Sequence, residues 1–98
     1  MYKIVMSKQA VKDSVLLDRA GLSAKSKEFI RIIRVNPYQT PPPYEKLSGN
    51  LRGYYSRRIN RQHRFVYEVL TNMGKILDKN GDAYDGIVKI VRMWTHYE

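Results

Sequence analysis

The strongest constraint on the fold is an apolar, β-branched run over residues 87–94, with the sequence Ile-Val-Lys-Ile-Val-Arg-Met-Trp. Sequences of this kind are typical of a strand buried inside a sheet. Thr95-His96-Tyr97-Glu98 follow the run directly. Chain ends are usually poorly ordered, but a buried strand holds the residues beside it in place. The run therefore predicts defined positions for an imidazole and a phenol at the tip of a strand.

Length and composition indicate a single domain over residues 1–98, with 43% apolar residues to form its core. No apolar run approaches the roughly 20 residues that a membrane helix needs. The N-terminal sequence is too short and too mixed for a secretory signal. Without cysteine, a disulfide framework and a thiolate zinc site are excluded. We therefore expect a cytoplasmic domain with no membrane partner, no metal site and no cofactor.

The charge constrains the partners more than the composition does. The chain carries 18 Lys and Arg against 9 Asp and Glu, a formal net charge of +9. A small domain this basic attracts polyanions. The charge favours a nucleic acid, or an acidic protein that masks the same surface, over a solvated surface that happens to be basic.

The first third of the chain predicts a strand and two helices. Residues 2–6 are rich in strand formers, and Ser7 is a good N-cap for a helix over residues 8–20 that stops at Gly21. Ser23 is expected to cap a second helix. That helix has one apolar stripe at helical period, formed by Leu22, Ser26, Phe29, Ile30 and Ile33.

A long Pro/Gly-rich connection follows, over residues 37–53. Loops of this length in a compact domain tend to be functional or disordered. Its consecutive prolines stiffen it, so that Glu45 is expected to have a defined place. The alternative is a polyproline segment that binds an SH3-like partner.

The second half of the chain predicts an antiparallel sheet. Residues 54–60 and 64–70 are two strands separated by a hairpin-length link, and a weaker strand near residues 75–79 turns at Asn80-Gly81 into the apolar run. Residues 78–89 fail as a calcium loop, because the glycine and glutamate positions hold Ala83 and Lys89. The expected fold is α+β: an antiparallel-rich sheet of four to five strands with two N-terminal helices packed on one face.

Three residue types suit metal-free cleavage of RNA. Such a reaction needs a base for the 2′-hydroxyl, a cation for the phosphorane and an acid for the departing 5′-oxygen. Glu45, Arg64 and His96 supply one of each, and Arg57 and Arg58 could bind phosphate bidentately. From spacing alone, a solvated loop acid, an exposed strand arginine and an inert terminal histidine fit as well.

Three motifs occur in order along the chain. Residues 44–59 have the sequence Tyr-Glu-Lys-Leu-Ser-Gly-Asn-Leu-Arg-Gly-Tyr-Tyr-Ser-Arg-Arg-Ile, residues 63–67 have His-Arg-Phe-Val-Tyr, and His96-Tyr97 completes the set. In this combination they resemble the YoeB/Txe branch of the RelE-like toxins. The family pattern is Glu-x-Leu, then Leu-x-Gly-aromatic-Trp/Tyr-Ser-Arg-Arg-Ile, then His-Arg-Leu/Phe-Val-Tyr, and finally His-Tyr.

The resemblance implies a toxin of a bacterial type II toxin–antitoxin pair that cleaves translated mRNA on the ribosome. It implies Glu45 as general base, Arg64 as transition-state arginine and His96 as general acid, with Tyr97 positioning the substrate. Expected RNA or phosphate contacts are Arg58, Arg57, Lys46, Tyr54 and Tyr55, of which only one of the two strand tyrosines faces the site. Expected partners are an acidic, partly disordered antitoxin, the ribosome and mRNA, in a homodimer or a toxin–antitoxin hetero-oligomer.

The chain departs from the family pattern at three places. Ser48 stands where family members often have a lysine, although Lys46 is a nearby cation. The segment 71–86 is longer than the family's tight turn, and Glu98 adds an acid after the terminal tyrosine. Two other functions stay open: a ParE-like toxin of the same fold that acts on DNA gyrase, and a non-enzymatic basic RNA-binding module.

Overall fold

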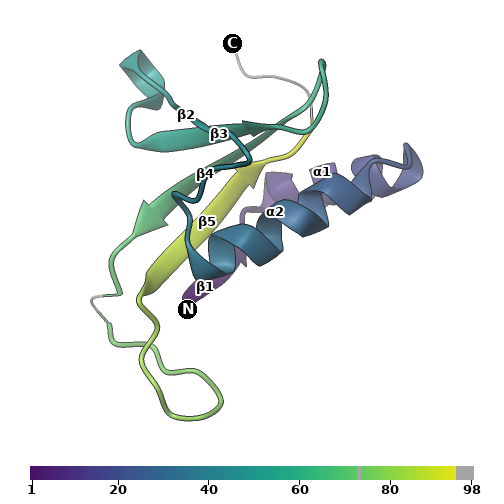
Figure 1. The fold of residues 1–98 in the computed structure, drawn as a ribbon. Helices are drawn as coiled ribbons and strands as arrows, with labels where there is room; N and C mark the ends of the chain where they lie inside the picture. Colours follow the sequence, from purple (N-terminus) through teal and green to yellow (C-terminus); the bar gives the residue numbers. More distant parts are fainter. Residues whose placement is uncertain (73, 95–98) are drawn as a thin grey trace.

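The computed structural model describes residues 1–72 and 74–94. Its helices and strands follow one another as a strand, two helices and then four strands (Figure 1). Their bounds are β1 Tyr2–Met6, α1 Lys8–Arg19, α2 Ser23–Val35, β2 Glu45–Lys46, the short 3₁₀ helix η1 Gly49–Leu51, β3 Tyr54–Arg58, β4 Arg64–Leu70 and β5 Gly86–Arg92.

The strands form one five-stranded sheet in the order β1-β5-β4-β3-β2. β1 pairs with β5 in parallel, and the other neighbours are antiparallel. The expected α+β fold with an antiparallel-rich sheet and two N-terminal helices is therefore confirmed. The apolar run forms β5 and lies between β1 and β4, which explains its composition, because a strand with neighbours on both edges has little contact with water.

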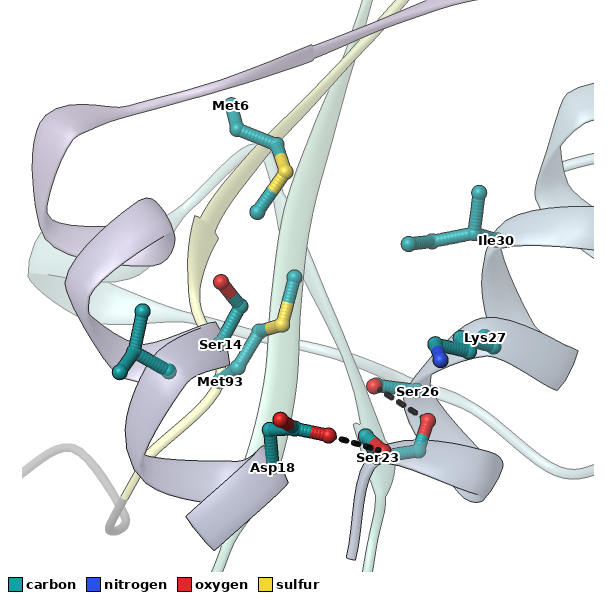
Figure 2. A pocket seen from close by; sticks show the side chains of 9 residues that line it. Met6, Ser14, Asp18, Ser23, Ser26, Lys27, Ile30 and Met93 are labelled. Atoms are coloured by element: carbon teal, nitrogen blue, oxygen red, sulfur yellow. Dashed lines mark hydrogen bonds between the residues drawn. The ribbon is translucent and has the colours of Figure 1, made fainter.

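The helices begin and end largely as the sequence predicts. The Ser7 hydroxyl accepts a hydrogen bond from the Ala10 amide at 3.0 Å, and Gly21 after α1 has a φ of 73°. The prediction that Ser23 caps α2 is wrong. Leu22 occupies the cap position and makes no side-chain hydrogen bond there. The Ser23 hydroxyl instead donates to Asp18 Oδ1 at 3.2 Å and ties the two helices together (Figure 2).

The core lies between the helices and one face of the sheet. The predicted stripe of α2 is confirmed, because Ser26, Phe29 and Ile33 are buried. The sheet contributes the alternate residues Phe65 and Tyr67 of β4, which are fully buried. The remaining core residues include Ala10, Leu17, Val88, Ile90 and Met93.

The expected weak strand at residues 75–79 is absent from the described part of the chain. A single bridge joins Leu77 to Ala83 around the predicted turn, where the Gly81 amide donates to the Asp78 carbonyl at 3.0 Å. The fifth strand of the sheet is instead β2, which is only two residues long. β3 also ends at Arg58 rather than at residue 60, because the Ile59 and Asn60 amides both bond to the His63 carbonyl and close the hairpin.

No helix among the described residues combines the length and apolar character needed to cross a membrane.

Candidate active site

Strand register places Glu45, Arg58 and Arg64 on the sheet face opposite the helices. Glu45 pairs with Ser56 across β2 and β3, and Arg58 pairs with Arg64 across β3 and β4. Side chains of opposed residues share a face, and successive residues alternate between faces. Because Phe65 points into the core, Glu45, Ser56, Arg58 and Arg64 point the other way.

Glu45 and Arg64 meet on this helix-free face. Glu45 Oε1 lies 3.6 Å from Arg64 Nη1, with the Glu45 side chain 62% exposed and the Arg64 side chain 21% exposed. The acid is thus open to a substrate, while the arginine is more enclosed. The structure thus brings a carboxylate and a guanidinium together on this face.

Arg58 and Arg64 form a like-charged pair on the same face. They occupy directly opposed positions on β3 and β4, an arrangement that destabilises a sheet unless an anion lies between the charges. Glu45 pairs with Arg64 only, and within residues 1–72 and 74–94 no carboxylate lies at ion-pair distance from Arg58. Arg58 is exposed, so its guanidinium is available to a phosphate.

A hollow of about 260 Å³ adjoins the ion pair. Its floor includes Ser56, whose side chain is 1% exposed and whose Oγ makes no hydrogen bond to any described residue. Its lining consists of Pro43, Tyr44, Glu45, Ser56, Arg58 and Arg64. The loop before β2 and the hairpin β3–β4 thus enclose one depression that two arginines and one carboxylate border.

Arg57 lies inside the protein, so we leave it out of the RNA-binding residues that the sequence suggested. It has no exposed surface, and its guanidinium donates to the carbonyls of Pro42 (2.6 Å), Gln39 (2.9 Å) and Pro37 (3.1 Å). Its Nε donates to the Tyr67 hydroxyl at 3.2 Å, which itself donates to the Pro37 carbonyl at 2.6 Å. Arg57 therefore fixes the proline-rich loop that leads to Glu45.

Tyr55 belongs to an aromatic cluster on the core side of β3, where it stacks on Tyr67 at 5.6 Å. Tyr38 and Tyr44 pack edge-on against it at 5.5 and 5.7 Å. Burial, with Tyr55 adding to the effect, raises the pKa of Tyr38 to about 12. Burial also raises the pKa of Tyr67, although Arg57 opposes it. The Tyr38 and Tyr67 phenols therefore stay protonated at neutral pH. The cluster packs Tyr38 and Tyr44 of the proline-rich loop against β3.

Tyr54 and Lys46 have opposite placements. Tyr54 alternates with Tyr55, so it is the strand tyrosine on the face of Glu45, where it lines a second hollow with Leu51, Val66 and others. Lys46 is exposed and pairs with Tyr55 in register, which places it on the face opposite Glu45. Of the predicted RNA contacts, Arg58 and Tyr54 thus share the face of the ion pair.

The predicted acid His96, together with Tyr97, lies outside the described residues. The chain up to Trp94 passes the Arg64 end of β4: Arg92 pairs with Val66, and the Trp94 ring stacks on His63 with centroids 4.0 Å apart. Asp13 accepts hydrogen bonds from the Met93 and Trp94 amides, a role that the sequence did not predict. A signal for it existed, because Asp13 falls on the buried stripe of α1 between Ala10 and Leu17.

Another hollow lies on the helix side of the molecule. It has a volume of about 390 Å³ and separates α1 from α2, with Met6 and Met93 at its base (Figure 2). Its other lining residues are Ser14, Val15, Asp18, Ser23, Ser26, Lys27 and Ile30.

No group of three or more His, Asp or Glu side chains in the described ranges is arranged to hold a metal ion.

Comparison with solved structures shows the same fold in bacterial toxins. A YoeB/ParE toxin from Agrobacterium tumefaciens superposes with a TM-score of 0.75 at 27% identity, covering 97% of this chain and 99% of that one. YoeB in the heterotetrameric YoeB–YefM toxin–antitoxin complex from Staphylococcus aureus superposes at 0.69 with 32% identity, covering 99% of both chains. The same Staphylococcus toxin is also known as a dimer.

Sequence comparison identifies the family. The toxin YoeB of Synechocystis is 40% identical over 57 residues, and that of Escherichia coli K12 is 42% identical over 45 residues. These matches span 59% and 54% of the two relatives. A family model described as the YoeB-like toxin of bacterial type II toxin–antitoxin systems matches residues 8–97. The fold is thus that of the RelE/ParE class. The chain belongs to the YoeB-like family of bacterial type II toxin–antitoxin systems within this class.

Proposed function

We propose that this chain is the toxin of a type II toxin–antitoxin pair and that it cleaves mRNA on translating ribosomes in the cytoplasm. Family membership and the net charge of +9 support this function. The observation that carries it is the Glu45–Arg64 pair, 3.6 Å apart, beside a hollow that Arg58 also lines. An accessible carboxylate beside two guanidinium groups suits a phosphodiester that is attacked by its neighbouring hydroxyl.

Cleavage requires two proton transfers, one from the attacking 2′-hydroxyl and one to the leaving 5′-oxygen. Glu45 takes the proton of the 2′-hydroxyl, whose oxygen then attacks the adjacent phosphorus. The bond from phosphorus to the 5′-oxygen breaks, and His96 donates the proton that this leaving oxygen needs. The products are a 2′,3′-cyclic phosphate and a free 5′-hydroxyl. Arg64, which stays positively charged, stabilises the charge that builds on the phosphorane oxygens.

Neighbouring residues would hold the message. Arg58 binds a phosphate next to the scissile one, and Tyr54 offers a ring on which an unstacked base can stack. Tyr97 positions the substrate from the C-terminal segment. Lys46, on the other face of β2, would contact RNA away from the cleaved nucleotide.

The partner that restrains the toxin would be an acidic antitoxin segment that is disordered when free and orders on binding. The basic surface of the chain supports such a partner, and the related Staphylococcus toxin forms a heterotetramer with its antitoxin. The assembly would be a toxin–antitoxin hetero-oligomer, with a homodimer as the free form.

Translation-coupled cleavage of a defined message tests the function. We expect Glu45→Gln, Arg64→Ala and His96→Ala each to lower the single-turnover rate by about 10² to 10⁴ fold while ribosome binding persists. Glu28→Gln and Arg19→Ala remove the same charges from the helices and serve as matched controls. Equal cleavage by all variants would refute the nuclease. Growth inhibition that survives in His96→Ala, with gyrase inhibited, would instead favour the ParE-like function.

A further inference from the structure

Asp13 is a buried carboxylate whose hydrogen bonds converge on the end of β5. Its side chain is 1% exposed and lies on the inner face of α1. Oδ1 accepts from Gln9 Nε2 at 2.9 Å, within the same helix. Oδ2 accepts from three donors of consecutive residues near the C-terminus: Arg92 Nε at 3.0 Å, the Met93 amide at 2.9 Å and the Trp94 amide at 3.2 Å.

The donors to Oδ2 begin at the residue where the pairing of β5 with β4 ends. Arg92 is the last residue of β5, and its pairing with Val66 is the final rung between β5 and β4. Asp13 supplies the acceptor for the next two amides, which would otherwise have none from a neighbouring strand. The Trp94 ring is held as well, by its stack on His63, and Arg92 Nη2 donates to the Trp94 carbonyl at 3.3 Å.

An apolar side chain could fill the same space, but it would leave the Met93 and Trp94 amides without this acceptor. Removing a carboxylate from water is costly unless hydrogen bonds replace its solvation, and apolar replacements of buried ion pairs are often neutral or stabilising. Burial acts to raise the pKa of Asp13, but the bonds from Met93, Gln9 and Arg92 outweigh it and lower the pKa, so the carboxylate stays charged. The three bonds to Oδ2 thus favour one backbone path at residues 92–94.

We propose that Asp13 is a positioning residue that fixes Met93 and Trp94, whose ring stacks on His63, the residue before Arg64 in the chain, so that the segment carrying His96 starts from a set point. Only one residue, Thr95, separates Trp94 from His96. Loss of the anchor at Trp94 is therefore expected to lower the rate of a step that depends on His96. The catalytic part of this inference rests on the proposed nuclease function; the anchoring part does not.

The chain's single tryptophan makes the anchor measurable, because Trp94 is itself the anchored residue. In Asp13→Asn we expect the Trp94 ring to become more accessible, so that a soluble quencher reduces its fluorescence more strongly. The far-ultraviolet circular dichroism should stay unchanged. Gln9→Ala, which removes only the bond to Oδ1, is the matched control and should leave the quenching as in the wild type. Unchanged Trp94 quenching in Asp13→Asn would overturn the anchor.

Single-turnover cleavage on programmed ribosomes tests the catalytic consequence. We expect Asp13→Asn to lower the maximal rate about 10 to 100 fold with the half-saturating ribosome concentration unchanged, and to cause no further loss in a His96→Ala background. Leu17→Ala, a core change one turn away, controls for lost stability. Multiplicative losses in the double variant would overturn the positioning role. A wild type that does not cleave would refute the nuclease function instead, and Trp94 quenching would still decide the anchor.

Discussion

Glu45 on β2 and Arg64 on β4 are joined across β3, with Oε1 and Nη1 3.6 Å apart on the helix-free face. The pair contributes little to the stability of the fold, because exposed ion pairs are worth about 0 to 1 kcal/mol. Its place beside Arg58 concentrates positive charge at one end of the sheet. The arrangement therefore suits a substrate anion better than it serves the fold.

Arg64→Lys separates charge from geometry at this site. Lysine keeps the positive charge near Glu45, but it loses the planar fork that contacts two phosphoryl oxygens at once. We expect the single-turnover cleavage rate to fall about 10² fold, with the midpoint of urea unfolding unchanged. Arg19→Lys, on the exposed end of α1, is the control. A rate equal to that of the wild type would show that charge alone suffices at position 64.

Arg57→Met should destabilise the protein, although it keeps most of the side-chain volume. The change removes the donor of the Pro42 and Gln39 carbonyls, whereas the Pro37 carbonyl keeps the Tyr67 hydroxyl, and each unsatisfied buried group costs about 1 to 3 kcal/mol. We expect a loss of about 3 kcal/mol in the free energy of unfolding, measured by urea denaturation. Arg58→Met, one residue along and exposed, should change it by less than about 0.5 kcal/mol. Similar values for both variants would contradict the role of Arg57 in fixing the proline-rich loop.

The contribution of Asp13 to the stability of the protein should be lost in acid. Hydrogen bonds lower the pKa of Asp13 below its ordinary value of 3.8 against the opposing effect of burial. Its stabilising contribution is therefore fully present above that value and is lost as the pH falls through the lower folded pKa. Urea denaturation between pH 2 and 7, roughly the range in which carboxylates titrate, should show a gap between the wild type and Asp13→Asn that narrows in acid. A gap that is constant across this range would contradict the assignment.

The sequence predicts the elements of the fold because local signals and the tertiary contacts agree. Ser7 both caps α1 through its bond to Ala10 and donates to the Val91 carbonyl of β5 at 3.0 Å. The apolar run over residues 87–94 needs two neighbouring strands, and β1 and β4 supply them. The missing prediction was β2, since a strand of two residues has no period that a sequence can show.

The predictions for buried charged residues were weaker for a physical reason. Arg57 looks like a phosphate ligand in the sequence, and its partners lie 15 to 20 residues away in the loop. The partners of Asp13 at Met93 and Trp94 lie 80 and 81 residues away. Polar residues acquire their roles from such distant contacts, whereas apolar periodicity is local. His96 stays a sequence prediction, since it lies outside the described residues.

Arg58 gives the clearest test of phosphate binding, because its guanidinium is exposed and faces the like charge of Arg64. Each phosphate contact to single-stranded RNA contributes about 0.7 to the slope of log affinity against log salt concentration. We expect Arg58→Gln to reduce that slope by about 0.7 for a single-stranded oligonucleotide that carries a 2′-deoxy substitution at the cleavage site. Arg19→Gln lowers the net charge equally at a distance and should leave the slope unchanged. Equal slopes for the wild type and both variants would show that Arg58 binds no phosphate, and equal reductions in both would indicate a response to net charge alone.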